Sequence, residues 1–286
     1  MSGILSIVST PIGNLEDITL RAIRVLREST LVACEDTRHT RKLLAHLGIA
    51  TRTVSYHEHN EATRAAELVE AVRRGERVAL VTDAGTPLLS DPGYRVLRAA
   101  LDAGLPIEVV PGPSALLTAL TGSGLGGADF YFAGFLPPKR AQRSKALAAM
   151  RDLNAAIVLY EAPHRVVESL EEIATALPGR ELCAARELTK LHEEWLRGTP
   201  ADLASQLRAR ESVKGEFTLV LGRPQQAAGE QDGQPIPLAI AAAIAAGVDR
   251  MAAIKDVARA RGLSKREVYR LLEEAREQAP PSDSGR

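Results

Sequence analysis

The sequence contains few aromatic residues, few cysteines and no long apolar run, and each shortage excludes a class of protein. Aromatic side chains make up only 3% of the 286 residues, so a core has to be built mainly from Ala, Leu, Val and Ile. The two cysteines, Cys34 and Cys183, lie in separate apolar, strand-like runs, which excludes a disulfide-rich secreted scaffold. We expect both thiols to be buried and reduced, as in a cytoplasmic protein.

Membrane and export signals are also missing from the sequence. Charges interrupt every apolar run well before the ~20 residues that a membrane-spanning helix needs. The first residues (MSGILS) lack the basic and apolar regions of a signal peptide. These features predict a cytoplasmic protein that has no membrane partner.

The charge balance excludes a protein that binds nucleic acid over its whole surface. Lysine plus arginine number 36, as do aspartate plus glutamate, so the formal net charge is zero. Local basic patches are still possible. Two are present without an intervening acid: Arg38, Arg41 and Lys42 in one, and Lys139, Arg140, Arg143, Lys145 and Arg151 in the other.

Strand-like and helix-like segments alternate along the first 222 residues. Short apolar strands are predicted at 4–9, 31–34, 54–56, 77–82, 107–110, 130–135, 155–160, 181–185 and 216–221. Segments with helical spacing or helix caps separate most of them. Such alternation predicts an α/β fold whose sheet is mostly parallel and covered by helices on both faces.

Composition also predicts where the chain divides. The Gly-rich stretch 122–127 separates an N-terminal αβ domain, 1–121, from a second αβ domain, 122–222. Residues 223–236 are rich in Gln, Gly and Pro and predict a linker. Residues 237–278 have the outline of a small helix-turn-helix, and 279–286 are predicted to be disordered.

The common nucleotide-binding motifs are absent, and other glycine- and proline-rich loops take their place. Neither G-x-G-x-x-G nor a Walker-type G-K-S follows a predicted strand. Loops 10–14 (TPIGN), 83–93 (DAGTPLLSDPG) and 111–115 (PGPSA) each follow a strand instead. Ligands bind at the carboxyl ends of parallel strands, so three such loops predict a ligand cleft there.

Seven strings carry a resemblance to a known family. They are residues 8–19 (VSTPIGNLEDIT), 34–40 (CEDTRHT), 55–61 (SYHEHNE), 81–87 (VTDAGTP), 110–115 (VPGPSA), 132–137 (FAGFLP) and 160–165 (YEAPHR). In this order they resemble the ribosomal RNA small subunit methyltransferase I family of the tetrapyrrole methylase superfamily. The resemblance covers residues 4 to about 222.

The resemblance implies a fold, a reaction and a set of contacts. It implies two αβ domains with S-adenosylmethionine in the cleft between them, a homodimer, and 2′-O-methylation of a 16S rRNA cytidine, cytidine 1402 in the usual RNA numbering. The residues that it places beside the cofactor are Asp83, Ala84, Gly85, Thr86, Pro87, Pro111, Ser114, Ala115, Ala133, Phe135, Leu136 and Thr218. Residues expected to face RNA, from the first loop and the basic patches, are Pro11, Gly13, Asn14, Arg38, Lys139, Arg140 and Arg143.

A ribose hydroxyl is a poor nucleophile, so a base or a charge that stabilises the developing oxyanion is expected to assist its methylation. The candidates follow two predicted strands: Glu35, Asp36 and His39 come after the strand 31–34, at the carboxyl edge of the sheet, and Glu187 and Lys190 come after the strand 181–185. Each acid could instead cap a helix or pair with a neighbouring arginine. Our hypothesis is that at least one of Asp36, Glu187 and Lys190 is needed for turnover.

Three other interpretations are weaker. The string His57-Glu58-His59 could bind a metal, but no third ligand is evident and no metal is expected. A small-molecule methylase of the precorrin type is the alternative function, although related enzymes carry G-x-G-x-G-D in the first loop and this chain has only Gly13. A nucleic-acid-binding regulator would need a basic recognition helix, whereas Lys265, Arg266 and Arg270 are balanced by nearby glutamates.

Overall fold

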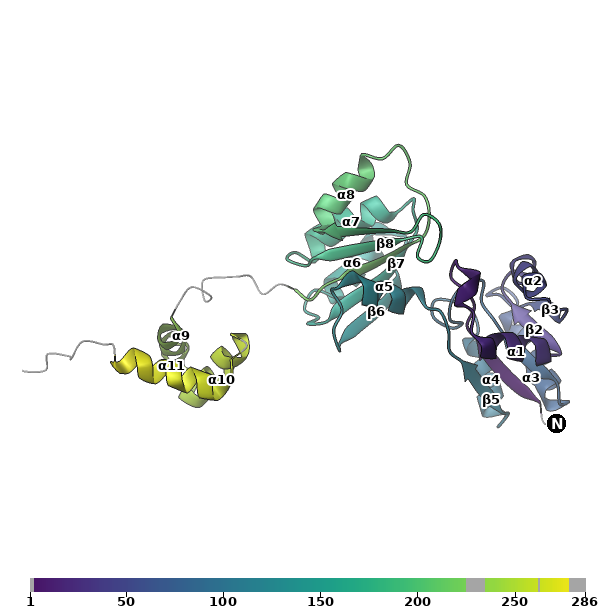
Figure 1. Cartoon of the computed structure of the whole chain (residues 1–286), viewed down its shortest axis with the longest axis horizontal. Helices are drawn as coiled ribbons and strands as arrows, with labels where there is room; N and C mark the ends of the chain where they lie inside the picture. Colours follow the sequence, from purple (N-terminus) through teal and green to yellow (C-terminus); the bar gives the residue numbers. More distant parts are fainter. Residues whose placement is uncertain (1–2, 225–234, 262, 278–286) are drawn as a thin grey trace, which may run out of the picture. The chain divides into compact units, whose positions relative to one another are not determined.

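The structure is a computed structural model that describes residues 3–224, 235–261 and 263–277. It forms two compact units, Met1–Pro224 and Gln225–Arg286 (Figure 1). The predicted disordered end, 279–286, and most of the predicted linker lie outside the described residues. Within the described part of the chain, no helix is long and apolar enough to cross a membrane.

The first half of the larger unit is built on a parallel sheet. Its strands are β1 (Ile4–Val8), β2 (Leu31–Cys34), β3 (Arg52–Ser55), β4 (Arg77–Leu80) and β5 (Ile107–Val110). Their order is β3-β2-β4-β1-β5, and every pairing is parallel. This confirms the predicted parallel sheet, and it brings the ends of β1, β4 and β5 side by side.

Helices cover both faces of this sheet. They are α1 (Leu20–Glu28), α2 (Thr37–His46), α3 (Glu61–Arg73) and α4 (Tyr94–Asp102), with a short 3-10 turn η1 (Leu15–Asp17) before α1. Apolar residues of α1 and α2 pack with Val32 and Cys34 on one face, whereas those of α3 and α4 pack with Leu5 and Ile7 on the other. Burial on both faces explains why these strands are almost continuously apolar in sequence.

The second half has a mixed sheet. Its strands are β6 (Phe130–Phe135), β7 (Ala156–Glu161), β8 (Leu182–Arg186), β9 (Glu194–Gly198) and β10 (Phe217–Leu221), in the order β6-β7-β10-β8-β9. Only β6 and β7 pair in parallel. The sequence did not predict β9, because this edge strand buries only Leu196 and has little apolar pattern.

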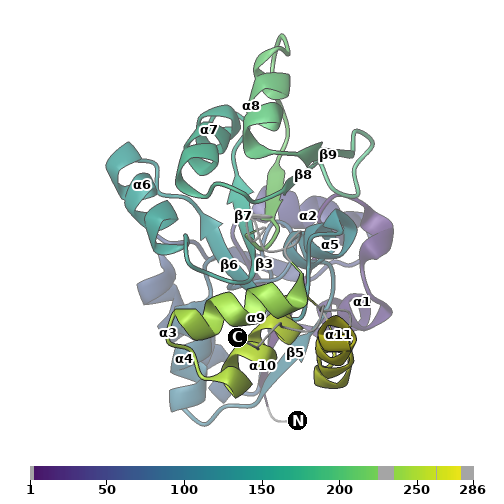
Figure 2. The ribbon, with the colours of Figure 1, turned by 90° about the vertical axis from the view of Figure 1, so that its left-hand side faces the viewer.

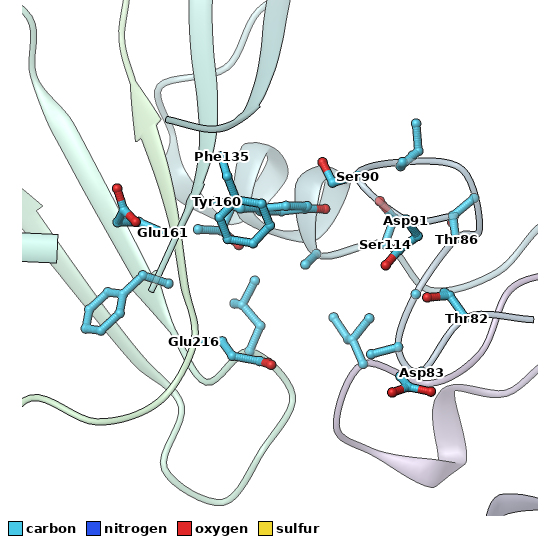
Figure 3. Close-up of a pocket in the computed structure, with 18 of the residues that line it drawn as sticks. Thr82, Asp83, Thr86, Ser90, Asp91, Ser114, Phe135, Tyr160, Glu161 and Glu216 are labelled. Carbon is cyan, nitrogen blue, oxygen red and sulfur yellow. The ribbon is translucent and has the colours of Figure 1, made fainter. Parts of the chain in front are cut away.

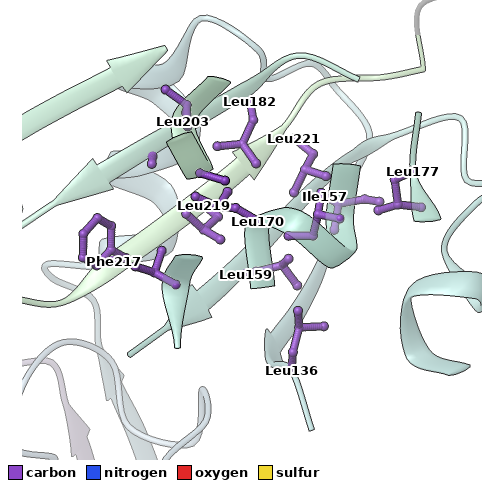
Figure 4. Packing of buried hydrophobic residues seen from close by; sticks show 14 of the residues in the cluster. Leu136, Ile157, Leu159, Leu170, Leu177, Leu182, Leu203, Phe217, Leu219 and Leu221 are labelled. Atoms are coloured by element: carbon purple, nitrogen blue, oxygen red, sulfur yellow. The ribbon is translucent and has the colours of Figure 1, made fainter. Parts of the chain in front are cut away.

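Side chains alternate between two cores in the second half. Helices α6 (Arg140–Ala149), α7 (Val166–Ala176) and α8 (Pro200–Arg208) cover one face, where Leu159 and Leu219 belong to a leucine-rich core (Figures 2 and 4). On the other face, Val158 and Val220 contact α5 (Ala115–Ser123). Ile12 of the first loop joins this second core. The predicted boundary at residue 121 groups α5 with the first sheet, whereas its apolar face packs on the second.

The smaller unit has a core of its own. It contains α9 (Ile236–Ala245), α10 (Arg250–Ala260) and α11 (Lys265–Glu277), which pack around Ile240, Ile254 and Val268. Ser264 and Glu267 form the predicted capping box: the Glu267 carboxylate accepts from the Ser264 N–H at 2.8 Å. Helix α9 falls within the predicted helical tail, 237–278, although its own sequence is apolar all round and shows no helical periodicity.

Candidate functional site

The three predicted ligand loops meet at the carboxyl edge of the first sheet. Thr10 and Gly85 exchange two backbone hydrogen bonds of 2.9 and 3.0 Å, which tie the loop after β1 to the loop after β4. The Thr86 hydroxyl accepts from Ser9 at 3.1 Å and donates to the Pro113 carbonyl at 3.2 Å. These bonds hold the loops in one arrangement, so little ordering is left for a ligand to impose.

A cavity of about 390 Å³ opens beside these loops, and both halves of the larger unit line it. Figure 3 shows Thr82, Asp83 and Asp91 of the first half on one side, with Phe135, Tyr160 and Glu216 of the second half across from them. The Phe135 and Tyr160 rings lie 5.6 Å apart between centroids. This volume is within the range of small-molecule sites, which is about 300–1,000 Å³.

Backbone strain is concentrated in two loops of the cavity wall. Among the described residues, the non-glycine residues with positive φ are Leu88 (73°), Ser90 (68°), Glu187 (51°) and Thr189 (64°). The first two lie in the loop after β4 and the others follow β8. Such conformations cost about 1–3 kcal/mol each and cluster at functional sites. The strained residues therefore lie in two loops that also contribute residues to the cavity lining.

Acidic groups dominate the charge of the cavity. Four carboxylates line it, those of Asp83, Asp91, Glu161 and Glu216, whereas no lysine, arginine or histidine stands among the described lining residues. Burial raises the pKa of Asp91 to about 6, against a smaller opposite contribution from the Thr82 hydroxyl. A cavity of this kind favours a positively charged ligand.

The structure brings most of the predicted cofactor residues together. Those that line the cavity are Asp83, Ala84, Gly85, Thr86, Ser114, Ala115, Phe135 and Thr218. Pro87, Pro111, Ala133 and Leu136 are not among the lining residues. Leu136 is only 2% exposed, and its side chain packs into the leucine-rich core instead. Leu136 directly follows the cavity residue Phe135 at the end of β6, and neighbouring residues of an extended chain point to opposite faces.

The predicted acids after β2 lie behind the cavity wall. Asp36 caps α2 and pairs with Arg38 at 2.7 Å, and hydrogen bonds from Arg38 hold the Asp36 pKa well below its usual range. The Asp36 N–H donates to Asp83 at 3.0 Å. Burial, followed by the charge of Asp83, raises the pKa of Glu35. Glu35, Asp36 and His39 are absent from the cavity lining, and of the three only Asp36 donates a hydrogen bond to a lining residue, Asp83.

The predicted pair after β8 lies on the cavity rim. Lys190 Nζ donates to Glu187 at 2.9 Å and to the cavity residue Glu216 at 2.8 Å. Burial alone would lower the Lys190 pKa, but the hydrogen bonds to Glu216 and Glu187 outweigh burial and the pKa is raised. Burial alone would raise the pKa of Glu187, but the hydrogen bonds from Lys190 and from the Glu216 N–H outweigh burial, and the pKa is lowered. Lys190 is therefore a cation at neutral pH and cannot act as a base.

The first loop contacts this same rim. The Asn14 N–H donates to Thr189 Oγ1 at 3.0 Å. A Cβ added at Gly13 would lie 2.4 Å from Lys190 Cγ and 2.8 Å from Thr189 Oγ1, so no larger residue fits there without displacing Lys190. Glycine at position 13 is thus explained by its contact with the second half.

The predicted RNA-facing cations have different surroundings. Lys139 and Arg140 are exposed at the start of α6, and Arg38 is exposed beside Asp36. Arg143 is only 1% exposed, and its guanidinium pairs with Glu172 at 2.8 Å and with Glu168 at 2.6 Å. A buried, doubly paired arginine cannot reach a phosphate, so this placement argues against the predicted RNA contact of Arg143.

Several cavity residues were not among the predicted contacts. Ser90 and Asp91 lie in the predicted ligand loop 83–93, and Tyr160 and Glu161 belong to the string YEAPHR that follows a strand. Their positions after strands were a usable signal. Thr82 lies in the string VTDAGTP, directly before that loop, whereas Leu188 and Glu216 carried no signal, because only the fold brings them to the cavity. Among the described residues no group of three or more His, Cys, Asp or Glu could hold a metal ion.

Two αβ halves joined around one cavity at the carboxyl edge of a parallel sheet define the class to which the chain belongs. The family model described as Tetrapyrrole (Corrin/Porphyrin) Methylases matches residues 5–204, and the chain belongs to this family. Similar solved structures agree. Uroporphyrin-III-C-methyltransferase from Thermus thermophilus is 26% identical over 77% of this chain and 94% of that one, with a TM-score of 0.57. Diphthine synthase, at 16% identity and a TM-score of 0.61, shares the fold.

Curated proteins that share one name are more similar in sequence to this chain than these two solved structures are. Proteins named Ribosomal RNA small subunit methyltransferase I include one from Mesorhizobium japonicum, 44% identical over 98% of this chain and 95% of its own length. The protein of that name from Halalkalibacterium halodurans is 42% identical over 94% of each. A third, from Micromonospora olivasterospora, is 49% identical over 81% of this chain and 74% of its own length.

Proposed function

We propose that this chain is a cytoplasmic enzyme that transfers a methyl group from S-adenosylmethionine to small-subunit ribosomal RNA. The observation that carries the proposal is the 42–44% identity, over 94–98% of this chain, to relatives named for that substrate. Similarity of this extent reaches beyond the fold into the loops of the site.

The residues of the cavity fit S-adenosylmethionine. Its acidic lining suits a cationic sulfonium, and the Phe135 and Tyr160 rings offer apolar faces for an adenosyl group. Ala84 and Gly85 bring the loop after β4 to the cavity wall, and Gly85 adopts a φ of 86°, which favours glycine. When bound, the sulfonium supplies an activated methyl group. The chain itself has to align the two reactants and exclude water.

Lys190 is our candidate for assisting the acceptor hydroxyl. It stays protonated at neutral pH and lies between Gly13 of the first loop and Glu216 of the cavity. An ammonium there would stabilise negative charge that develops on the acceptor oxygen. Asp36 is a weak candidate for the base, because its carboxylate is engaged by Arg38 and by the N-terminus of α2.

The finer proposal concerns the acceptor atom: the 2′-hydroxyl of one decoding-centre cytidine, cytidine 1402 of 16S rRNA. To test it, purified protein is incubated with S-adenosylmethionine carrying a labelled methyl group and with 30S subunits that lack the modification. A 2′-O-methyl group removes the hydroxyl that attacks the adjacent phosphate, so the product should resist alkaline cleavage at a single phosphodiester bond. Labelled RNA that is cleaved everywhere by alkali would instead mean a base methylase.

The alternative is a small-molecule methylase, which the similarity to uroporphyrin-III-C-methyltransferase keeps open. The same labelled donor is therefore offered with uroporphyrinogen III in place of 30S subunits. Transfer to the tetrapyrrole and none to RNA would reverse the proposal. Free 16S rRNA is a third acceptor that tells whether the assembled subunit is required.

For RNA binding we expect a local contribution from Lys139 and Arg140. Changing both to glutamine should weaken binding to 30S subunits and lower the slope of log K against log salt by about 1.5, as expected for two lost phosphate contacts. Filter binding between 50 and 300 mM KCl measures the slope. Arg98→Gln, in an exposed ion pair on α4, is the control. An unchanged slope in the double variant would remove α6 from the RNA surface.

A homodimer is also proposed, on the basis of the resemblance and of the exposed aromatic residues Phe130 and Tyr131 on edge strand β6. Light scattering coupled to size exclusion gives the molar mass. A mass of one chain at micromolar concentration would contradict the proposal.

A further inference from the structure

Asp91 differs from the other carboxylates of the cavity in having neither a partner of opposite charge nor an N–H donor. Glu161 accepts from Ser169 and lies 3.4 Å from Arg165. Glu216 pairs with Lys190, and Asp83 accepts the Asp36 N–H. Over the residues that the structure describes, no ion pair and no N–H donor is found for Asp91.

The groups that face Asp91 cannot neutralise it. They are Thr82 at the end of β4, Glu35 after β2, Asp83 in its own loop, and Tyr160 on β7. Two are acidic and two are neutral hydroxyls. Ionising a partly buried carboxylate without a counter-charge costs free energy. Such a group stays protonated unless a cation from outside the chain binds beside it.

A second, independent observation points to a ligand at the same place. Thr82 is 3% exposed and lines the cavity, and its Oγ1 makes no hydrogen bond of normal geometry within the described part of the chain. Buried hydroxyls without partners are rare in folded proteins. A buried hydroxyl without a hydrogen bond of normal geometry lies beside a carboxylate without an N–H donor or counter-charge, and together they indicate a missing polar partner in the cavity wall.

We propose that Asp91 is a specificity-determining residue that makes the site prefer the positively charged methyl donor to its neutral demethylated product. The inference rests on the proposed function, since it takes S-adenosylmethionine as the donor. S-adenosylmethionine and S-adenosylhomocysteine share the adenosyl, amino and carboxylate groups, and they differ by the methyl group and the sulfonium charge. Contacts with the shared groups cancel in the ratio of their affinities, so the ratio isolates what the charge contributes.

Loss of the methyl group then removes the attraction between Asp91 and the sulfur. The product would leave more readily than the donor, which opposes product inhibition. The preference requires an ionised Asp91, whose pKa of about 6 places the change within an accessible range. A cation that lowers this pKa by one unit or more binds the ionised form at least about tenfold more tightly than the protonated form.

The experiment is isothermal titration of the full chain with each ligand separately. In the wild type at pH 8, we expect the Kd of S-adenosylhomocysteine to exceed that of S-adenosylmethionine. Asp91→Asn, of equal size and uncharged, should weaken donor binding about tenfold and leave product binding within about twofold. Asp102→Asn, at the exposed end of α4, is the matched control and should change neither Kd.

A pH series on the wild type tests the same inference without a substitution. The preference for the donor should diminish as the pH falls from 8 to 5, because Asp91 becomes protonated, and the Asn variant should show no such trend. The inference is overturned if Asp91→Asn changes both Kd values equally or neither, or if turnover is lost while both are unchanged, which would make Asp91 a base. Wild type that binds neither ligand would refute the proposed function itself.

Discussion

Replacing Lys190 with methionine should lower the rate of methyl transfer to 30S subunits by about a hundredfold, the usual cost of losing one charge that stabilises an oxyanion. Methionine keeps most of the side-chain stem and removes only the ammonium that lies between Glu187 and Glu216. Single-turnover assays with saturating donor should show the defect in the chemical step, with donor Kd nearly unchanged. Lys190→Arg should recover much of the rate.

The rim of the cavity around Lys190 can also be disturbed by a substitution in the first loop, at Gly13. Gly13→Val places a branched side chain where the Lys190 stem and Thr189 now lie, so it should lower the rate comparably while leaving Lys190 in the chain. Displacements of about 1 Å near reacting groups can cost a hundredfold. If both variants turned over normally, the loop after β8 would have no part in catalysis. Urea unfolding of each variant separates loss of activity from loss of structure.

Arg143→Met should destabilise the larger unit by about 3 kcal/mol, in the lower part of the range for breaking a buried ion pair. The guanidinium makes two hydrogen bonds with Glu172, at 2.8 and 2.9 Å, and its removal leaves this largely buried carboxylate with only the exposed Arg140, 3.6 Å away, as a partner of opposite charge. Equilibrium unfolding in urea should show a lower midpoint with the slope unchanged.

The control is Arg140→Met, one turn earlier on the same helix, where the side chain is 83% exposed. Its effect on stability should stay within about 0.5 kcal/mol, as for most surface substitutions. The hydrogen bond from Arg143 lowers the pKa of Glu172, so the stability lost with Arg143 should itself shrink in acid, once Glu172 is protonated. Equal stability of the two variants at pH 7 would show that Arg143 is not structural.

Much of the fold could be predicted from local pattern. Apolar runs gave the five parallel strands, and glycines at helix ends and Ser or Thr caps gave the boundaries of several helices, as at Thr19 and Gly48. Both cysteines are free and buried, as predicted. Strand β9 was missed, because it is a polar edge strand, and the bounds of helix α9 within the predicted helical tail were not predicted, because this helix is apolar on every side.

The site was predictable only in part, for a similar reason. The loops after β1, β4 and β5 are recognisable by their glycines and prolines, and eight of the twelve predicted cofactor residues do line the cavity. Sequence cannot tell which side of a strand a residue faces once the backbone is irregular. Thus Leu136 was grouped with Phe135, although Leu136, directly after β6, packs into the core.

Sequence by itself determined the class of fold, the edge of the sheet where the cavity lies and, through resemblance to a family, the reaction to be tested. These depend on patterns of residues that are close together in the chain, which can be recognised in a single sequence. Only the tertiary structure decided that Arg143 is buried, that Gly13 contacts Lys190 across 177 positions, and that Asp91 lacks a counter-charge. Burial and charge pairing depend on contacts between residues that are distant in the chain. The electrostatics of the site could therefore be seen only in the folded structure.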